Sequence, residues 1–383
     1  MIHSEYSLCA NVKVVLGENE AAIYCLDRHK IYRIPCALGE KILSRRLSSE
    51  ELRQLVENNI LVLGVEKQHS IQQAIKKQED APCFKKVWLE ITPYCNLRCT
   101  HCYMGDVHTI QNPIDWAIVL NYLFTWGVEE IVLLGGEPFC SPELSDIIEV
   151  IRVTDHNVRI IIITNGTCCS LSTLQLIKKH NISLHFSLLG ATASEHDAIT
   201  QVPGSFEKLT QTIALATQLG IKVLLVSTLK HNESQKKSFI KQMVDERFPN
   251  IPVSFHLMRP QGRICSSAEE YIYDETQLAT RISLPFYLES THHHPCLYRK
   301  VVFSFNGEVY PSIMARYEHK KLTEVLLEKP TDIFDDWWML TKDKIKGCCN
   351  CALRYACFDC RGYANSLTSP PINCKLAPKL LDK

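Results

Sequence analysis

The chain has 383 residues, of which 46% are hydrophobic and 22% are charged, as in an ordinary globular protein with room for two or three domains. Its 42 basic and 42 acidic residues give a formal net charge of zero, so we expect no nucleic-acid partner. The first residues lack a basic segment followed by an apolar core, and no apolar run approaches about eighteen residues. We therefore expect neither a signal peptide nor a membrane partner.

Eighteen cysteines are many for this length, and several stand in short clusters. Without an export signal, clustered cysteines indicate metal binding in a reducing cytoplasm, which is the location we expect. The remaining cysteines are scattered, and we expect them to be small buried hydrophobes. They are Cys9, Cys25, Cys36, Cys83, Cys140, Cys168, Cys169 and Cys265.

Residues 1–80 are predicted to form a small winged-helix-like domain that begins with a three-stranded meander. Ser48 and Glu51 have the spacing of a capping box at the start of a helix. Residues 71–79 are rich in Gln and Lys and are expected to connect this domain to the next. The predicted elements are strands at 12–16, 21–26, 30–34 and 60–63 and helices at 37–46 and 48–58.

Three cysteines follow the next apolar run, at Cys95, Cys99 and Cys102. A structural zinc site closes its shell with four ligands. A four-iron cubane held at three corners instead leaves one iron open to an exogenous ligand. His101 could be a fourth, zinc-type ligand, but it lies between two of the cysteines, where the backbone makes simultaneous coordination awkward.

Residues 84–270 alternate between apolar runs and helical patterns. Six such units predict a parallel sheet covered by helices, with its active site at the carboxyl ends of the strands. The predicted strands are 87–91, 131–134, 159–163, 183–188, 221–228 and 253–257. The predicted helices are 113–126, 142–153, 171–180 and 206–219.

Polar motifs follow several of these strands. Gly135 and Gly136 allow the backbone to approach a ligand closely, although a lone Gly-Gly is also an ordinary turn. Asn165 begins an Asn-Gly turn, Ser187 ends the fourth strand, and Arg259 follows the sixth.

A second group of cysteines, in a CX2CX5CX2C pattern with one more cysteine beyond it, lies near the carboxyl terminus. Zinc and iron both bind such sets, and spacing alone does not decide between them. The group consists of Cys348, Cys351, Cys357, Cys360 and Cys374.

The segment CNLRCTHCY, residues 95–103, resembles the CX3CX2C cluster loop of the radical S-adenosylmethionine (SAM) enzymes. The resemblance implies an α/β fold with a partial (β/α)6 barrel over residues 84–270. It also implies a [4Fe-4S] cluster on Cys95, Cys99 and Cys102. The open iron would chelate the amino and carboxylate groups of SAM, and one electron would cleave the sulfonium to give a 5'-deoxyadenosyl radical.

The same resemblance assigns further contacts to SAM. The GGEP motif would hold the amino group, Ser187 would face the ribose or carboxylate, and Tyr103 would lie near the adenine. For Asn165, Ser187 and Arg259, a plain turn, a serine satisfied by the backbone and a surface arginine remain open alternatives. The assigned residues are Tyr103, Gly135, Gly136, Glu137, Pro138, Asn165, Ser187 and Arg259.

Residues 348–362 resemble the start of the cysteine-rich SPASM extension of radical SAM peptide maturases, here assigned to residues 290–383. The resemblance implies one auxiliary iron–sulfur cluster on the four cysteines Cys348, Cys351, Cys357 and Cys374. A second auxiliary cluster would use Cys360 and Cys296.

The sequence departs from the SPASM pattern at the second cluster, because Ser312 stands where a cysteine is expected and CX5CX3C is shortened to CX5CX2C. Cys349 or a histidine of the triplet 292–294 could substitute. Solvated histidines are the commoner meaning of such a triplet. A single auxiliary cluster, with Cys296 merely structural, is also open.

These features together predict a radical SAM/SPASM enzyme that installs a crosslink or other oxidative modification in a ribosomally made precursor peptide. Residues 1–80 resemble the domain that adds a leader segment to a sheet edge as an extra strand. A ferredoxin- or flavodoxin-type protein would supply electrons. The catalytic base stays unassigned, with Asp359 and His196 as candidates. The alternatives are a sulfatase-maturase-type enzyme and a zinc-ribbon binding protein without catalysis.

Overall fold

The computed structural model describes residues 6–64, 83–105, 114–230, 232–264, 282–372 and 374. The chain divides into two compact units, each assembled from separate stretches. No helix in these described ranges is both long and apolar enough to cross a membrane. The predicted connector at 71–79, Cys265 and the first residue of the helix predicted at 113–126 lie outside the described residues. The first unit comprises Met1–Ala81, Tyr273–Tyr298 and Asp336–Lys383, and the second comprises Pro82–Ile272 and Arg299–Asp335.

The second unit is built on a nine-stranded sheet with the order β11-β10-β9-β8-β7-β6-β12-β13-β14. The six strands from β6 to β11 are all parallel to their neighbours, as predicted. Buried apolar residues explain why β6 to β10 lie inside the fold, whereas no residue of β11, the edge strand, is buried. The strands are β6 (Lys86–Glu90), β7 (Glu130–Leu134), β8 (Arg159–Thr164), β9 (Ser183–Ser187), β10 (Val223–Leu229) and β11 (Val253–Leu257).

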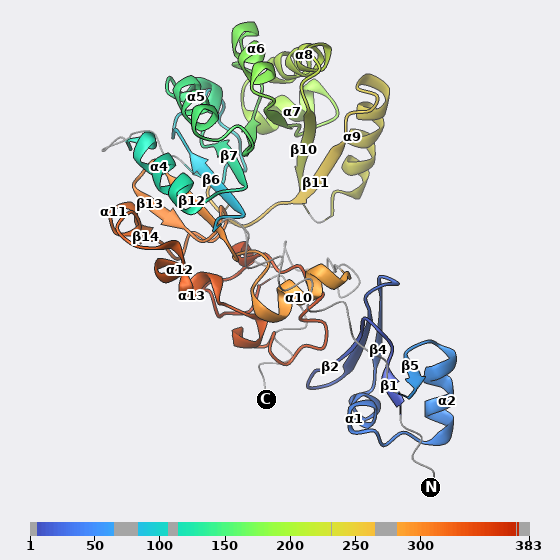
Figure 1. Ribbon diagram of the computed structural model, residues 1–383. Helices are drawn as coiled ribbons and strands as arrows, with labels where there is room; N and C mark the ends of the chain where they lie inside the picture. Colours follow the sequence, from blue (N-terminus) through green and yellow to red (C-terminus); the bar gives the residue numbers. More distant parts are fainter. Residues whose placement is uncertain are drawn as a thin grey trace. The chain divides into compact units, whose positions relative to one another are not determined.

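Helices connect the successive parallel strands, and together they form a partial (β/α)6 barrel (Figure 1). Side chains fix several helix starts: Asp115 accepts a hydrogen bond from Ala117 N, and Ser170 accepts one from Thr173 N. Four of the helices were predicted, while α7 and α9 were not. They are α4 (Trp116–Trp126), α5 (Leu144–Thr154), α6 (Leu171–Lys179), α7 (Ala193–Thr200), α8 (Ser205–Gln218) and α9 (Ser234–Arg247).

Three further strands widen this sheet and were not predicted. β12 pairs in parallel with β6, and Ser304 lies opposite Glu90. β13 and β14 then continue the sheet with antiparallel pairing. These elements are β12 (Lys300–Ser304), β13 (Glu308–Tyr310), β14 (Lys320–Lys321), α11 (Leu322–Val325) and α12 (Pro330–Ile333).

The amino-terminal part of the first unit contains the predicted meander. The Ser48 hydroxyl accepts from Glu51 N while the Glu51 carboxylate accepts from Ser48 N, so the predicted capping box is confirmed. A first strand, β1, was not predicted; it pairs antiparallel with β5. The elements are β1 (Tyr6–Leu8), β2 (Val12–Leu16), β3 (Ala21–Cys25), β4 (Lys30–Ile34), α1 (Cys36–Ser44), α2 (Ser49–Glu57) and β5 (Leu61–Leu63).

One face of this meander packs on the cysteine-rich segment of the same unit. Tyr24 is buried, and its hydroxyl donates to Ala352 O at 2.7 Å. Val15 and Leu26 share an apolar cluster with Leu353. The carboxyl-terminal part of the unit also contains α10 (Leu284–His292), α13 (Asp335–Trp338), η4 (Lys342–Lys344) and η5 (Arg361–Tyr363).

Candidate functional site

The three cysteines after β6 lie close to one another at the carboxyl edge of the parallel sheet. Burial, followed by the neighbouring Cys95 and Cys102, raises the pKa of the Cys99 thiol to about 12. Burial also raises the pKa of Cys95 to about 11, and Cys102 adds to that shift. Binding to a metal cluster would reverse this preference, because coordination deprotonates a thiol. The loop therefore presents three neighbouring thiols, and burial keeps those of Cys95 and Cys99 protonated until a cation binds.

Neighbouring strand ends fix this cysteine loop. Asn165, which follows β8, donates its side-chain amide to Cys95 Sγ at 3.7 Å and to Asn96 Oδ1 at 3.0 Å. Asn96 donates in turn to Thr167 Oγ1 at 2.7 Å. On the other side, Thr100 N donates to Ile199 O in α7. The structure thus brings the predicted Asn165 to the loop and adds Asn96, which the sequence analysis missed.

The two glycines of the GGEP motif lie against the chain that leads from β6 to the cysteines. A Cβ on Gly135 would lie 2.4 Å from Thr92 O, and one on Gly136 would lie 2.1 Å from Tyr94 O. Gly136 N donates to Thr92 O at 2.7 Å, which holds the two loops together. Only glycine permits this approach. The sequence analysis expected these glycines to let the backbone approach a ligand. In the structure they let it approach Thr92 and Tyr94 of the same chain.

Glu137 is buried and ties the end of β7 to the end of β8. Its carboxylate accepts hydrogen bonds from Thr164 Oγ1 at 2.6 Å, Asn165 N at 2.7 Å and Phe139 N at 3.1 Å. Burial raises the pKa of Glu137 to about 7, although these hydrogen bonds oppose the shift. Glu137 therefore positions Asn165 beside the cysteines, and Pro138 begins the short turn η1 (Pro138–Cys140) that follows.

The segment after β11 fastens the cysteine loop from the opposite side. Arg263 donates from Nη1 to Cys99 O and from its backbone N to Cys102 O, both at 3.0 Å. A Cβ on Gly262 would lie 2.1 Å from Cys102 O. Arg259, the predicted contact, instead donates to Leu257 O in its own strand at 3.1 Å. Gly262 and Arg263 follow Arg259 closely in the sequence, and their position just after the sixth strand was the signal for this role.

Tyr103 contacts two charged residues, Glu90 at the end of β6 and Arg316 beyond β13. Its hydroxyl donates to Glu90 Oε1 at 2.8 Å, and Arg316 lies 5.6 Å from its ring centre. Glu90 is buried and forms an ion pair with Arg316. Burial raises the pKa of Tyr103 well above its usual value, and Glu90 adds to the shift. The sequence analysis missed Glu90 and Arg316, since the residues of this pair are distant along the chain.

Three other candidates have simpler surroundings. Ser187 ends β9 at the same edge of the sheet as the cysteine loop, opposite Val226. His101 is partly buried, and burial lowers its pKa to about 4. His196, a candidate base, is buried and accepts Leu189 N at Nδ1, which places its hydrogen on Nε2. A neutral ring held in this way is a poor proton acceptor.

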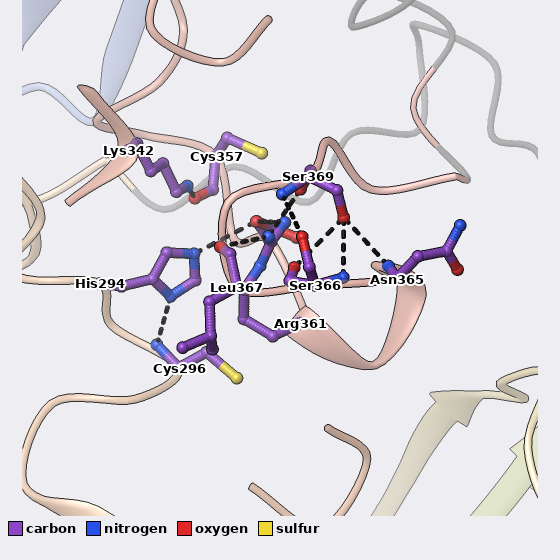
Figure 2. A network of polar contacts seen from close by, with 10 residues as sticks. His294, Cys296, Lys342, Cys357, Arg361, Asn365, Ser366, Leu367 and Ser369 are labelled. Carbon is purple, nitrogen blue, oxygen red and sulfur yellow. Dashed lines mark hydrogen bonds and ion pairs between the residues drawn. The ribbon is translucent and has the colours of Figure 1, made fainter. Parts of the chain in front are cut away.

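Four carboxyl-terminal cysteines also lie near one another. Burial raises the pKa of Cys357 to about 11; Lys342 opposes the shift, while Cys374 and Cys351 add to it. Burial raises the pKa of Cys348 as well, and Cys357 is among the neighbours that add to it. Lys342 donates to the carbonyl of Cys357 and so fixes the backbone between two cysteines (Figure 2).

Zinc sites and iron–sulfur sites differ in how close their cysteine ligands must come to one another. In the described part of the chain, no three His, Cys, Asp or Glu side chains meet closely enough to hold a single metal ion. The ligands of one zinc ion must all reach the same centre. Each corner of a cubane is a separate iron, so its cysteines stand farther apart. Zinc and cubane sites thus place different demands on a group of cysteines.

The comparisons with known proteins agree with this geometry. Residues 89–240 match the family model described as Radical SAM superfamily. The chain thus contains a radical SAM domain. The matched range begins in β6 and includes the three cysteines, the GGEP motif and Asn165. The predicted family and its partial barrel are therefore confirmed.

Curated relatives of this radical SAM protein have different activities in their names. It is 24% identical over 201 residues to the AdoMet-dependent heme synthase of Nitratidesulfovibrio vulgaris, covering 51% of this chain and 54% of that protein. It is 26% identical over 242 residues to the antilisterial bacteriocin subtilosin biosynthesis protein AlbA of Bacillus subtilis, covering 58% of this chain and 53% of that protein. The chain thus spans about half the length of these relatives.

A solved structure resembles the chain over nearly its full length. Streptococcus suis SuiB bound to the precursor peptide SuiA matches with a TM-score of 0.57 and 14% identity, covering 96% of this chain and 100% of that one. At this identity the match establishes a shared fold. The matched part of the chain includes the amino-terminal and carboxyl-terminal regions as well as the barrel.

Proposed function

We propose that this protein is a radical SAM enzyme that modifies a ribosomally made precursor peptide, forming a crosslink or another oxidative change. The observation that carries the proposal is the meeting of three cysteine thiols with the GGEP loop at one edge of the parallel sheet. The similarity to AlbA and to peptide-bound SuiB supports a peptide substrate. The similarity to the heme synthase covers about half of the chain, so it supports the cleavage of SAM and not a heme substrate.

Different residues of the second unit would bind the cluster, bind SAM and position the cysteine loop. Cys95, Cys99 and Cys102 would each hold one iron of a [4Fe-4S] cluster, and the GGEP loop would receive the amino group of SAM. When bound, the cluster and SAM supply one-electron cleavage of a sulfonium and a radical that abstracts hydrogen. Asn165 donates a hydrogen bond to the Cys95 sulfur and so stabilises its thiolate form. Arg263 holds the carbonyls of Cys99 and Cys102, which keeps the loop rigid.

Residues 1–80 would bind the leader of the precursor peptide at the β4 edge of the meander. Near β2 the meander is covered, because Glu18 N donates to Asn350 O at 2.8 Å and Arg354 donates to Leu16 O at 2.9 Å. β4 is the opposite edge of this three-stranded sheet, and Tyr32 at its centre is 40% exposed. An added strand gains main-chain hydrogen bonds at such an edge, with specificity from alternate side chains.

The carboxyl-terminal extension would hold an auxiliary iron–sulfur cluster on Cys348, Cys351, Cys357 and Cys374. Such a cluster could accept the surplus electron from the modified peptide. A ferredoxin- or flavodoxin-type protein would reduce the SAM-binding cluster. The proposed location is the cytoplasm, where thiols stay reduced; no disulfide joins the cysteines among the described residues.

The proposed function is tested by replacing Cys99 with alanine. The Cys99→Ala variant removes one of three iron ligands, so we expect no cleavage of SAM under dithionite after anaerobic reconstitution. Cys9→Ala is the matched control, because Cys9 is also partly buried and lies in the amino-terminal domain. Cleavage at the wild-type rate by Cys99→Ala would contradict the assignment of the cluster.

A further inference from the structure

The second auxiliary cluster implied by the SPASM resemblance lacks ligands in this chain. Of its cysteines, Cys296 and Cys360 remain, and Ser312 replaces a third. Ser312 is buried, and its hydroxyl accepts Met314 N at 3.3 Å within its own loop. A [4Fe-4S] cluster with full protein ligation needs four ligands, so other side chains would have to supply the missing ones.

His294 cannot supply one, because both of its ring nitrogens are already used. Nδ1 lies 3.2 Å from the backbone N of Cys296, which can only donate, so Nδ1 is the acceptor. Nε2 must then carry the hydrogen, and it lies 3.2 Å from Asp359 Oδ2. The ring is fully buried, and burial lowers its pKa to about 4. No lone pair remains for iron.

The other histidines of the triplet also have protein partners. His293 stacks on Tyr298 at 3.5 Å, and its Nδ1 lies 3.2 Å from Trp338 O. His292 ends α10, and its Nδ1 lies 3.0 Å from Leu288 O. The interpretation of the triplet as solvated histidines is therefore wrong for His294, because this ring is buried and bonded to the buried carboxylate of Asp359.

A buried polar network joins the two segments that would have held the second cluster (Figure 2). Asp359 accepts from His294 and also pairs with Arg361. Arg361 is fully buried and donates from Nη1 to Leu367 O at 3.1 Å and to Ser369 O at 2.8 Å. Asp359 and Arg361 flank Cys360 in sequence, and His294 lies two residues before Cys296. Hydrogen bonds therefore already make the connection that a cluster would make.

Cys296 has the surroundings of a small hydrophobic side chain. It packs on an apolar cluster of Leu297, Leu340 and Ile345. Leu297 and Ile345 are fully buried there. The proposed ligand Cys348 packs on the same cluster, so the case against Cys296 as a ligand rests on the missing partner ligands and not on its apolar surroundings.

We propose that the chain builds a single auxiliary cluster, on Cys348, Cys351, Cys357 and Cys374, and that the His294–Asp359–Arg361 network replaces the second cluster structurally. Cys296 and Cys360 then bind no cluster. This inference rests on the proposed function, since it presupposes iron–sulfur chemistry in the extension. It differs from the SPASM pattern in the number of clusters.

Iron and sulfide analysis with Mössbauer spectroscopy on the anaerobically reconstituted full chain tests the proposal. We expect about eight irons per chain, from two four-iron clusters. The double variant Cys296→Ser/Cys360→Ser should keep about eight irons, whereas Cys357→Ser should fall to about four. About twelve irons in the wild type, or a loss of about four in the double variant, would overturn the single-cluster proposal.

The same preparations separate this inference from the proposed function. SAM cleavage with about twelve irons would leave the radical SAM assignment standing and reject only the single auxiliary cluster. A reconstituted chain without iron and without SAM cleavage would reject both. The wild-type iron count needs no variant, so it decides the question even if a substitution prevents folding.

Discussion

At the scale of single residues, His196 links the loop after β9 to the stability of the barrel. The ring lies 5.7 Å from Phe206 and accepts Leu189 N at Nδ1. Burial lowers the pKa of His196 to about 4, and Asp197 opposes the shift. The folded chain therefore binds fewer protons at this site than the unfolded chain between about pH 6.5 and pH 4. Stability from the neutral ring is complete above this window and is lost as the pH falls through it.

His196→Asn should remove this pH dependence, because the Asn carbonyl can accept Leu189 N and does not titrate. We expect the unfolding free energy of the variant to gain up to about 3 kcal/mol relative to wild type as the pH falls from 7.5 to 4. Thermal and urea unfolding across this range measure the difference. His319→Asn, at a 49% exposed side chain, is the control. An unchanged difference between His196→Asn and wild type across the range would refute the prediction.

Gly136 tests how tightly the GGEP loop and the cysteine loop must fit. In Gly136→Ala, the new Cβ would lie 2.1 Å from Tyr94 O, so one backbone segment must move. We expect a loss of roughly 3 kcal/mol of stability and a weaker affinity for SAM. Gly204→Ala is the control, since its Cβ meets nothing within 4 Å and only its φ of +78° is unfavourable. Its expected cost is about 1 kcal/mol. Thermal unfolding and equilibrium dialysis with SAM measure both, and equal losses would contradict the role of the close contact.

At the scale of elements, β4 is where the proposed leader site can be tested. Tyr32→Glu places a charge at the centre of this edge strand, so the dissociation constant for a leader-bearing peptide should rise by about tenfold or more. Cleavage of SAM without peptide should stay unchanged, because Tyr32 lies in the first unit and the three cysteines lie in the second. Fluorescence anisotropy with a labelled peptide measures the affinity.

Leu43→Glu provides the matched control for β4. Leu43 is 49% exposed and lies on α1 of the same domain. It receives the same charge away from the sheet edge, so its peptide affinity should match that of wild type. If both variants bind as wild type does, or both lose binding equally, the leader does not use β4.

The elements that the sequence predicted best have local causes. The runs that became β6 to β10 are apolar enough to be buried, and the capping box at Ser48 is a pattern within four residues. β12 escaped prediction because its partner β6 lies far away in the chain. The same cause explains the missed site residues: Arg316 pairs with Glu90, and Arg263 holds Cys99, across long sequence separations. Cysteine spacing, by contrast, is itself a short-range pattern.

At the scale of the whole molecule, the first unit combines the amino-terminal domain with the cysteine-rich segment. Deleting residues 1–80 would remove Val15, Tyr24 and Leu26, and so uncover Leu353 and its apolar neighbours. We expect this variant to lose the auxiliary cluster, with iron falling from about eight to about four per chain, while the SAM-binding cluster remains.

Elemental analysis and SAM cleavage measure the two effects of the deletion. Tyr32→Glu serves as the comparison, because it leaves the apolar cluster intact and should keep its full iron content. Full iron in the deletion variant would show that the amino-terminal domain does not support the extension. A loss of peptide turnover after deletion alone would therefore not identify leader binding.

The parallel pairing of β6 with β12 also matters while the chain is being made. β6 leaves the ribosome long before β12, so one side of it has no native partner during most of translation. Such an open edge can pair with strands of other nascent chains. Forms of the protein that stop before Lys300 would keep this edge open permanently, and they are expected to aggregate rather than accumulate as free barrels.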